Sequence, residues 1–143
     1  MRIENIGFIG LGAMGSVMAP LLGKSDYNVF GYDIGSKIEK STGVSQVQSL
    51  NDLKNMDVII LTDPSNMNYL TGYDGWSFYV PQGIIMALEL NEPIWFGRRQ
   101  DSKGAKVTTY LQDKNIIYYP EDLIQSPPTH PYDFVSTFIH ENN

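Results

Sequence analysis

An α/β fold is predicted for this chain of 143 residues, with a strand–helix–strand beginning that continues into a mixed sheet flanked by helices. Three features predict it. A glycine-rich turn at 10–15 separates an apolar strand pattern from a helical one. An apolar, β-branched run at 57–62 is typical of a buried central strand. Further short strands and helices follow that run, and a chain of this length suits one layered domain.

The first 62 residues alternate strands and helices. The expected elements, in order, are a strand at 3–9, a helix at 13–22, a strand at 27–32, a short helix from Ser36 to Lys40, a weak strand at 44–47, a brief helix at 50–55 and the central strand at 57–62. Pro20 lies inside the first helix, where it is expected to bend or shorten it.

The second half is richer in turns. The expected elements are a short helix at 66–70, a turn at 71–75, a hairpin formed by 83–90 and 93–96, an amphipathic helix at 101–111, a strand at 116–119, a proline-rich loop at 125–131 and a helix at 132–140. This order of elements is typical of a sheet covered by helices rather than of a helical bundle.

Composition and charge narrow the classes of protein. Hydrophobic residues make up 42% and charged residues 18% of the chain, which is typical of a globular domain. The net charge is −6, and residues 57–143 carry the whole acidic excess. No basic face is expected, so we expect no nucleic-acid partner. The absence of cysteine excludes disulfides and thiolate metal sites.

The apolar runs are too short for a membrane span, which needs about 20 residues. The chain also begins without the basic region and long apolar stretch of a secretory signal. We therefore expect a soluble, cytoplasmic protein with no membrane partner.

The sharpest local motif is the segment Gly10-Leu11-Gly12-Ala13-Met14-Gly15. It follows a predicted strand and opens a predicted helix, which is the context that a dinucleotide-binding turn requires. Gly10 permits the tight turn, Gly12 lets the backbone approach a pyrophosphate, and Gly15 allows close packing of helix on strand. The N-terminus of the helix then offers unpaired N–H groups and the positive end of its dipole to the phosphates.

Asp33 stands at the end of the second predicted strand. An acid there accepts a hydrogen bond from a ribose 2′-hydroxyl and repels a 2′-phosphate, which favours NAD over NADP. The predicted cofactor-binding residues are Gly10, Leu11, Gly12, Ala13, Met14, Gly15 and Asp33. The alternatives are a glycine turn retained for packing, a solvated acid at a strand end, and a half-site that holds no ligand.

The segment Ile6-Gly-Phe-Ile-Gly-Leu-Gly-Ala-Met-Gly15, with Met18-Ala19 and Leu22 after it, resembles the start of the β-hydroxyacid dehydrogenases. That family includes 3-hydroxyisobutyrate dehydrogenase and relatives of 6-phosphogluconate dehydrogenase. The resemblance covers residues 3–62 and implies a Rossmann-like fold with a nicotinamide cofactor, so that 1–56 form a partial dinucleotide-binding segment. The family's second cofactor-binding half, Ser-Gly-Gly motif, catalytic Lys and helical domain have no counterpart in this sequence.

The segment from Asp57 to Trp76, DVIILTDPSNMNYLTGYDGW, resembles a different family, the N-terminal domain of the creatinase/prolidase group. The likeness continues through Trp95-Phe-Gly-Arg98 to His130-Pro131 and is to the ectoine-hydrolase and Xaa-Pro-peptidase-like members. It covers residues 57–143 and implies a small α/β domain that precedes a metal-dependent catalytic domain and supports dimerisation. Since the strand at 57–62 fits both families, the two segments are compatible with one merged sheet.

No catalytic residue and no metal ligand is predicted in this chain. The resemblance implies a metal site of two Asp, one His and two Glu, and no such pattern surrounds His130 or His140, so we interpret the first as a loop residue and the second as solvated. Arg98 and Arg99 are interpreted as a surface pair that balances the acidic half, with a substrate carboxylate as the alternative partner. The aromatic residues between 69 and 79 are interpreted as core or dimer surface.

Three hypotheses for function are open at this point. In the first, the chain is a fusion or fragment that combines a partial NAD(P)-binding module with the non-catalytic N-terminal domain of a creatinase-type hydrolase, and it has no activity alone. In the second, it is a dimerisation or docking domain whose catalytic part is elsewhere. In the third, it is an NAD-binding protein like 3-hydroxyisobutyrate dehydrogenase. NAD is the expected cofactor, no metal is expected, and the expected partner is a second copy or a catalytic chain.

Overall fold

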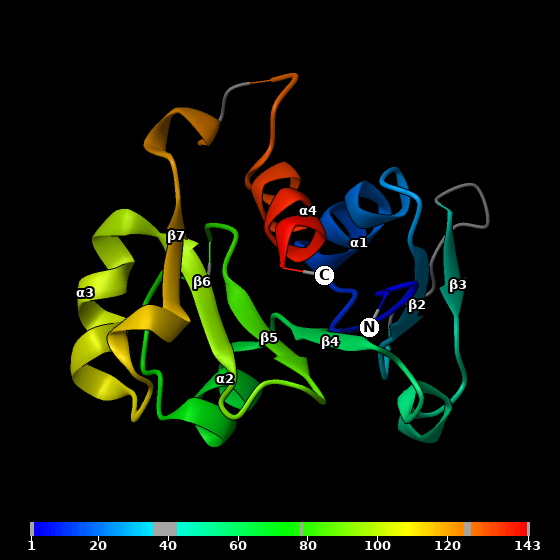
Figure 1. The fold of residues 1–143 in the computed structure, drawn as a ribbon, viewed down its shortest axis with the longest axis horizontal. Coiled ribbons are helices and arrows are strands. Elements are labelled where there is room, and N and C mark those ends of the chain that lie inside the picture. Colours follow the sequence, from blue (N-terminus) through cyan, green and yellow to red (C-terminus); the bar gives the residue numbers. More distant parts are fainter. Residues whose placement is uncertain (1, 36–42, 78, 125–126, 143) are drawn as a thin grey trace.

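The computed structural model describes residues 2–35, 43–77, 79–124 and 127–142. Within these ranges a seven-stranded sheet carries helices on both faces (Figure 1). The α/β class and the mixed sheet predicted from the sequence are confirmed. The helix predicted from Ser36 to Lys40 lies outside the described residues.

The described elements follow the predicted order closely. The strands are β1 (Asn5–Ile9), β2 (Asn28–Tyr32), β3 (Val44–Gln46), β4 (Val58–Leu61), β5 (Gly83–Ala87), β6 (Ile94–Arg98) and β7 (Ile116–Tyr119). The α-helices are α1 (Gly15–Gly23), α2 (Pro64–Thr71), α3 (Arg99–Thr108) and α4 (Pro131–Glu141), and short 3₁₀ turns are η2 (Leu50–Leu53), η3 (Asp113–Asn115) and η4 (Glu121–Leu123). The brief helix expected at 50–55 is thus a 3₁₀ turn, and α1 continues through Pro20.

The strand order is β3-β2-β1-β4-β5-β6-β7. The first four strands are parallel, and β1 lies between β2 and β4, with Gly7 opposite both Phe30 and Ile59. The predicted hairpin is formed by β5 and β6, which makes β5 antiparallel to β4 and β6, while β7 runs parallel to β6. A Rossmann-like βαβ beginning therefore continues into a mixed sheet, with β4 at its centre as predicted.

Two cores lie on the two faces of the sheet because successive side chains of a strand point to opposite faces. On β6, Phe96 belongs to the core under α1 and α4, whereas Trp95 belongs to the core under α2 and α3. The same alternation separates Ile60 from Leu61 on β4. The core under α1 and α4 buries residues from both sides of residue 57, among them Ile6 and Tyr132, whereas the described buried residues of the other core all follow residue 57.

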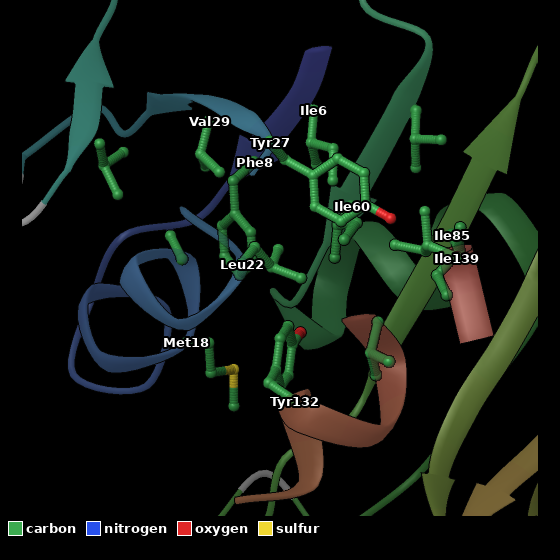
Figure 2. Close-up of a cluster of buried hydrophobic side chains, with 14 of the residues drawn as sticks. Ile6, Phe8, Met18, Leu22, Tyr27, Val29, Ile60, Ile85, Tyr132 and Ile139 are labelled. Carbon is green, nitrogen blue, oxygen red and sulfur yellow. The ribbon is translucent and has the colours of Figure 1, made fainter. Parts of the chain in front are cut away.

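Helix α4 joins the two ends of the chain in one core. The ring of Tyr132 lies 6.0 Å from that of Phe8 on β1 and 5.3 Å from that of Phe96 on β6, measured between ring centroids. Figure 2 shows Tyr132 facing Phe8 and Leu22, and all three side chains are buried. The segment that resembles hydrolases therefore packs its last helix against the glycine-rich beginning of the chain.

Candidate functional site

The glycine turn sits where the carboxyl ends of β1, β2 and β4 meet. The N–H of Gly10 donates to the carbonyl of Tyr32 at 3.0 Å, and the hydroxyl of Thr62 donates to the carbonyl of Gly10 at 3.3 Å. Gly10 has φ +97°, a left-handed conformation that glycine adopts without strain. The turn is thereby fixed at the point where the connections from β1 and β4 leave in opposite directions, which is the usual ligand position in such sheets.

The other two glycines of the motif have opposite surroundings. A Cβ on Gly15 would collide with the backbone carbonyl of Gly10, so only glycine allows α1 to begin this close to β1. A Cβ on Gly12 would meet no atom within 4 Å. Packing therefore explains Gly15 but not Gly12, whose outer side is open for the approach of a ligand.

The N-terminus of α1 is left without a protein cap. Met14 is the N-cap residue and makes no side-chain hydrogen bond to the helix, and the first turn holds no acidic residue. Among the described residues, the N–H groups of 12–15 find no acceptor. Such free N–H groups and the positive end of the helix dipole form an arrangement that binds anions.

Asp33 is placed beside this turn by two backbone hydrogen bonds. Its Oδ2 accepts from the N–H of Leu11 at 2.7 Å, and its Oδ1 accepts from the N–H of Gly35 at 2.8 Å. The carboxylate is therefore fixed by the turn rather than freely solvated.

A cavity of about 270 Å³ adjoins the turn on the side away from Asp33. Its wall contains Met14 of the turn, residues 79–81 ahead of β5, Leu123 and Ile124 after β7, and His130 and Pro131 at the start of α4. Apart from Met14, these residues belong to the segment that resembles hydrolases. Sequence reasoning missed this wall, since Met14 and His130 are far apart in the chain and α4 brings them together.

His130 is the N-cap residue of α4 rather than a plain loop residue. Its Nδ1 accepts from the N–H of Tyr132 at 3.1 Å, while Asp133 accepts from the N–H of His130 at 2.7 Å. Because Nδ1 is an acceptor, the ring proton of the neutral imidazole is on Nε2. Burial lowers the pKa of His130 below its ordinary value, against the opposing effect of Asp133. His140 is exposed, as expected.

Arg98 forms a largely buried ion pair with Asp101, so its interpretation as part of a surface pair is wrong. Its guanidinium donates from Nε to Asp101 at 3.0 Å, and the side chains of the two residues are 14% and 11% exposed. The hydroxyl of Ser77 donates to the same carboxylate at 2.6 Å. Arg99 instead lies over the ring of Tyr118, at 4.8 Å from its centroid. The spacing from Arg98 to Asp101 on one helical turn was the signal for this pair.

The aromatic residues between 69 and 79 divide into two groups. Tyr73 is buried in the core under α2 and α3. Tyr69 and Trp76 are 89% and 84% exposed, and Tyr79 borders the cavity next to Met14. Phe78 lies outside the described residues.

In the described part of the chain, no three His, Asp or Glu side chains gather in a way that could hold a metal ion. None of the helices in the same ranges is both long and apolar enough to span a bilayer.

Residues 5–75 match the family model of the NAD binding domain of 6-phosphogluconate dehydrogenase. The match contains the glycine turn and the four parallel strands β1 to β4. It also continues through α2, beyond residue 62, at which the resemblance seen in the sequence ends.

The chain is similar to curated hydrolases as well. It is 49% identical to ectoine hydrolase of Halomonas elongata over 86 residues, which are 60% of this chain and 21% of that protein. It is 38% identical to the uncharacterized hydrolase/peptidase y4tM of Sinorhizobium fredii over 104 residues, 73% of this chain and 26% of that protein. It is 35% identical to y4tL of the same organism over 88 residues, 62% of this chain and 23% of that protein.

The chain thus spans 21% to 26% of the length of these relatives. The alignment with y4tM covers 104 of the 143 residues, so it must overlap the dehydrogenase-type match at 5–75. The two similarities therefore share part of the chain. Both recognitions made from the sequence are confirmed. The chain is related to the NAD-binding domains of the 6-phosphogluconate dehydrogenase type and to the hydrolases of the creatinase family.

Proposed function

We propose that the chain binds NAD at the glycine turn between β1 and α1. The observation that carries the proposal is the open side of Gly12, next to N–H groups of 12–15 that have no acceptor among the described residues. A pyrophosphate at this position accepts hydrogen bonds from those groups and lies at the positive end of α1. The match of residues 5–75 to an NAD-binding family supports the same ligand.

The proposal includes a preference for NAD over NADP. The adenosine ribose hydroxyls donate to the carboxylate of Asp33, which Leu11 and Gly35 hold beside the turn. A 2′-phosphate would bring two negative groups together there. Bound NAD supplies hydride chemistry, while the residues of this chain, Gly10, Leu11, Gly12, Ala13, Met14, Gly15 and Asp33, bind and orient it.

Isothermal titration calorimetry with NAD and NADP tests the proposal, with Gly12→Ala as the variant. Gly104→Ala is the matched control, since a Cβ on either glycine meets nothing within 4 Å, and Gly104 lies on α3, away from the turn. We expect NAD to bind the unchanged chain and Gly104→Ala alike, and Gly12→Ala to lose at least tenfold in affinity. Absence of binding, or equal affinity of both variants, would refute the proposal.

A second candidate function is an accessory domain for a creatinase-type hydrolase, which dimerises or docks on a catalytic chain. Support comes from the 49% identity to ectoine hydrolase and from the exposure of Tyr69 and Trp76, since large exposed aromatic side chains are enriched at protein interfaces. Light scattering over a concentration series tests it. A dimer whose dissociation constant rises in Trp76→Ser supports this function. A chain that stays monomeric and does not bind a creatinase-type catalytic chain contradicts it.

We further propose that the chain is a fusion or fragment of the two kinds of module, with the division near residue 56, and that it has no turnover of its own. The match of residues 5–75 to the dehydrogenase-type family and the similarity to ectoine hydrolase support the presence of both kinds of module. The purified chain is to be assayed for NAD-dependent oxidation of 3-hydroxy acids and for hydrolysis of Xaa-Pro dipeptides. Turnover in either assay would contradict the proposal.

A further inference from the structure

We propose that the cavity between Met14 and His130 holds the nicotinamide end of NAD, so that the hydrolase-like segment supplies the wall of the cofactor site that the partial dinucleotide-binding segment lacks. This inference rests on the proposed function. It assigns a binding role to residues that neither similarity gives one.

Position is the first argument. Asp33 lies at the end of β2, on one side of the turn, while the cavity is lined by segments that adjoin β5, β7 and α4, on the other side. Met14 belongs to both the turn and the cavity wall. A dinucleotide with its pyrophosphate at Gly12 and its adenosine at Asp33 therefore directs its other end toward the cavity.

Size is the second argument. The cavity has a volume of about 270 Å³, below the roughly 300–1,000 Å³ of pockets that enclose a whole drug-sized ligand. It accommodates one ring system and not a complete dinucleotide. The rest of the ligand then lies along the open turn, where Gly12 leaves room for it.

The chemistry of the wall is the third argument. Most of the wall is apolar surface, which suits the faces of a flat ring. This surface is formed by Met14, Val80, Pro81, Leu123, Ile124 and Pro131. His130 contributes one directional donor, because its Nδ1 is occupied by the N–H of Tyr132 and its Nε2 carries the proton. The Nε2–H has no acceptor among the described residues, and the carboxamide oxygen of nicotinamide is an acceptor of the required kind.

Charge favours this ring over an anionic group. The imidazole of His130 is neutral in this hydrogen-bond arrangement, so it adds no positive charge beside the pyridinium ring of NAD. Asp133 lies in the first turn of α4 and offsets the positive end of that helix. The cavity is therefore suited to a planar heteroaromatic ring that carries a carboxamide.

The experiment uses saturation-transfer NMR and calorimetry on the whole chain, with NAD and ADP-ribose as ligands. His130→Asn is the test variant, since Asn at an N-cap still accepts the N–H of Tyr132, and His140→Asn on the exposed side of α4 is the matched control. We expect saturation of both the adenine and the nicotinamide protons, and NAD affinity about three- to tenfold above that of ADP-ribose. His130→Asn removes the nicotinamide saturation and the affinity difference, and His140→Asn changes neither.

The two proposals fail in different ways. Adenine saturation without nicotinamide saturation, or a nicotinamide signal that His130→Asn leaves unchanged, overturns the role of the cavity and leaves NAD binding at the turn in place. If the chain without substitutions transfers saturation to neither ring of NAD, the proposed function is overturned, and the role of the cavity with it.

Discussion

The carboxylate of Asp33 accepts a hydrogen bond of 2.7 Å from the backbone N–H of Leu11, which ties the end of β2 to the glycine turn after β1. One residue therefore both shapes the turn and presents negative charge beside it. The remaining oxygen accepts from Gly35, so the carboxylate is held in place before any ligand arrives. Such preorganisation reduces the ordering cost of binding.

Asp33→Asn separates the two roles of this residue. The Asn carbonyl can still accept from the N–H of Leu11, but the negative charge is lost. Because hydrogen bonds to charged groups contribute about 1.5–3 kcal/mol, we expect NAD affinity to fall about tenfold or more and NADP affinity to fall less. Calorimetry with both cofactors measures the ratio, and a Leu11 amide that still exchanges slowly with solvent in an NMR spectrum shows that the turn is retained. An unchanged ratio would exclude Asp33 from ribose recognition.

Gly15→Ala should damage folding rather than binding. The added methyl group collides with the Gly10 carbonyl and presses on the ring of Phe8, so α1 must move away from β1. Overpacking of this kind costs typically about 1–3 kcal/mol. Urea denaturation followed by circular dichroism measures the loss. Gly12→Ala is the control and should unfold at nearly the concentration of the unchanged chain, whereas equal loss in both variants would contradict the packing role assigned to Gly15.

Asp101→Ala should destabilise the fold far more than the loss of an exposed acidic side chain does. It leaves the guanidinium of Arg98 and the hydroxyl of Ser77 without their shared acceptor in a part of the fold that is largely closed to water. Removal of one partner of a buried pair costs roughly 3–5 kcal/mol. Thermal and urea unfolding are the measurements.

The matched control for the Asp101→Ala substitution is Asp113→Ala. Asp113 pairs with Lys106 at 2.8 Å, but their side chains are 78% and 41% exposed. Exposed pairs contribute about 0–1 kcal/mol. Similar losses of stability in the two variants would show that the Arg98 pair is not the internal anchor of β6 and α3 that its geometry indicates.

The stability of the fold should depend on pH through His130. Burial lowers the pKa of the folded His130 below its ordinary value of 6.5, so the unfolded chain binds the proton more readily than the folded one. The contribution of neutral His130 to the free energy of unfolding is therefore complete above about pH 6.5, and it is lost as the pH falls through the lower pKa of the folded state. A protonated Nδ1 also cannot accept the N–H of Tyr132.

Urea unfolding between pH 7.5 and 5 measures this effect. The unchanged chain and His140→Asn should lose stability in parallel, and His130→Asn should lose less because its cap does not titrate. If all three chains show the same slope, the protonation of His130 is not linked to folding.

Much of the fold follows from local sequence pattern. Short apolar runs, rich in β-branched residues at 57–62, predict β1, β2 and β4, and the turn signals around 91–93 predict the β5–β6 hairpin, because strand propensity and turn chemistry act over a few residues. Element ends are less well predicted. The helix expected at 101–111 is α3, Arg99–Thr108, since its start depends on the geometry of β6 and its end on the packing near Gly72.

The sequence by itself determined the glycine turn, the acid at the end of β2, the central strand and the relation to two families. Each of these depends on residues that are close together in the chain. Tertiary structure alone decided that one sheet runs through both segments and that His130 and Met14 line the same cavity. The physical reason is the packing of α4 beside α1, in which Tyr132 lies against Phe8. Contacts between residues more than a hundred positions apart leave no periodicity in a single sequence.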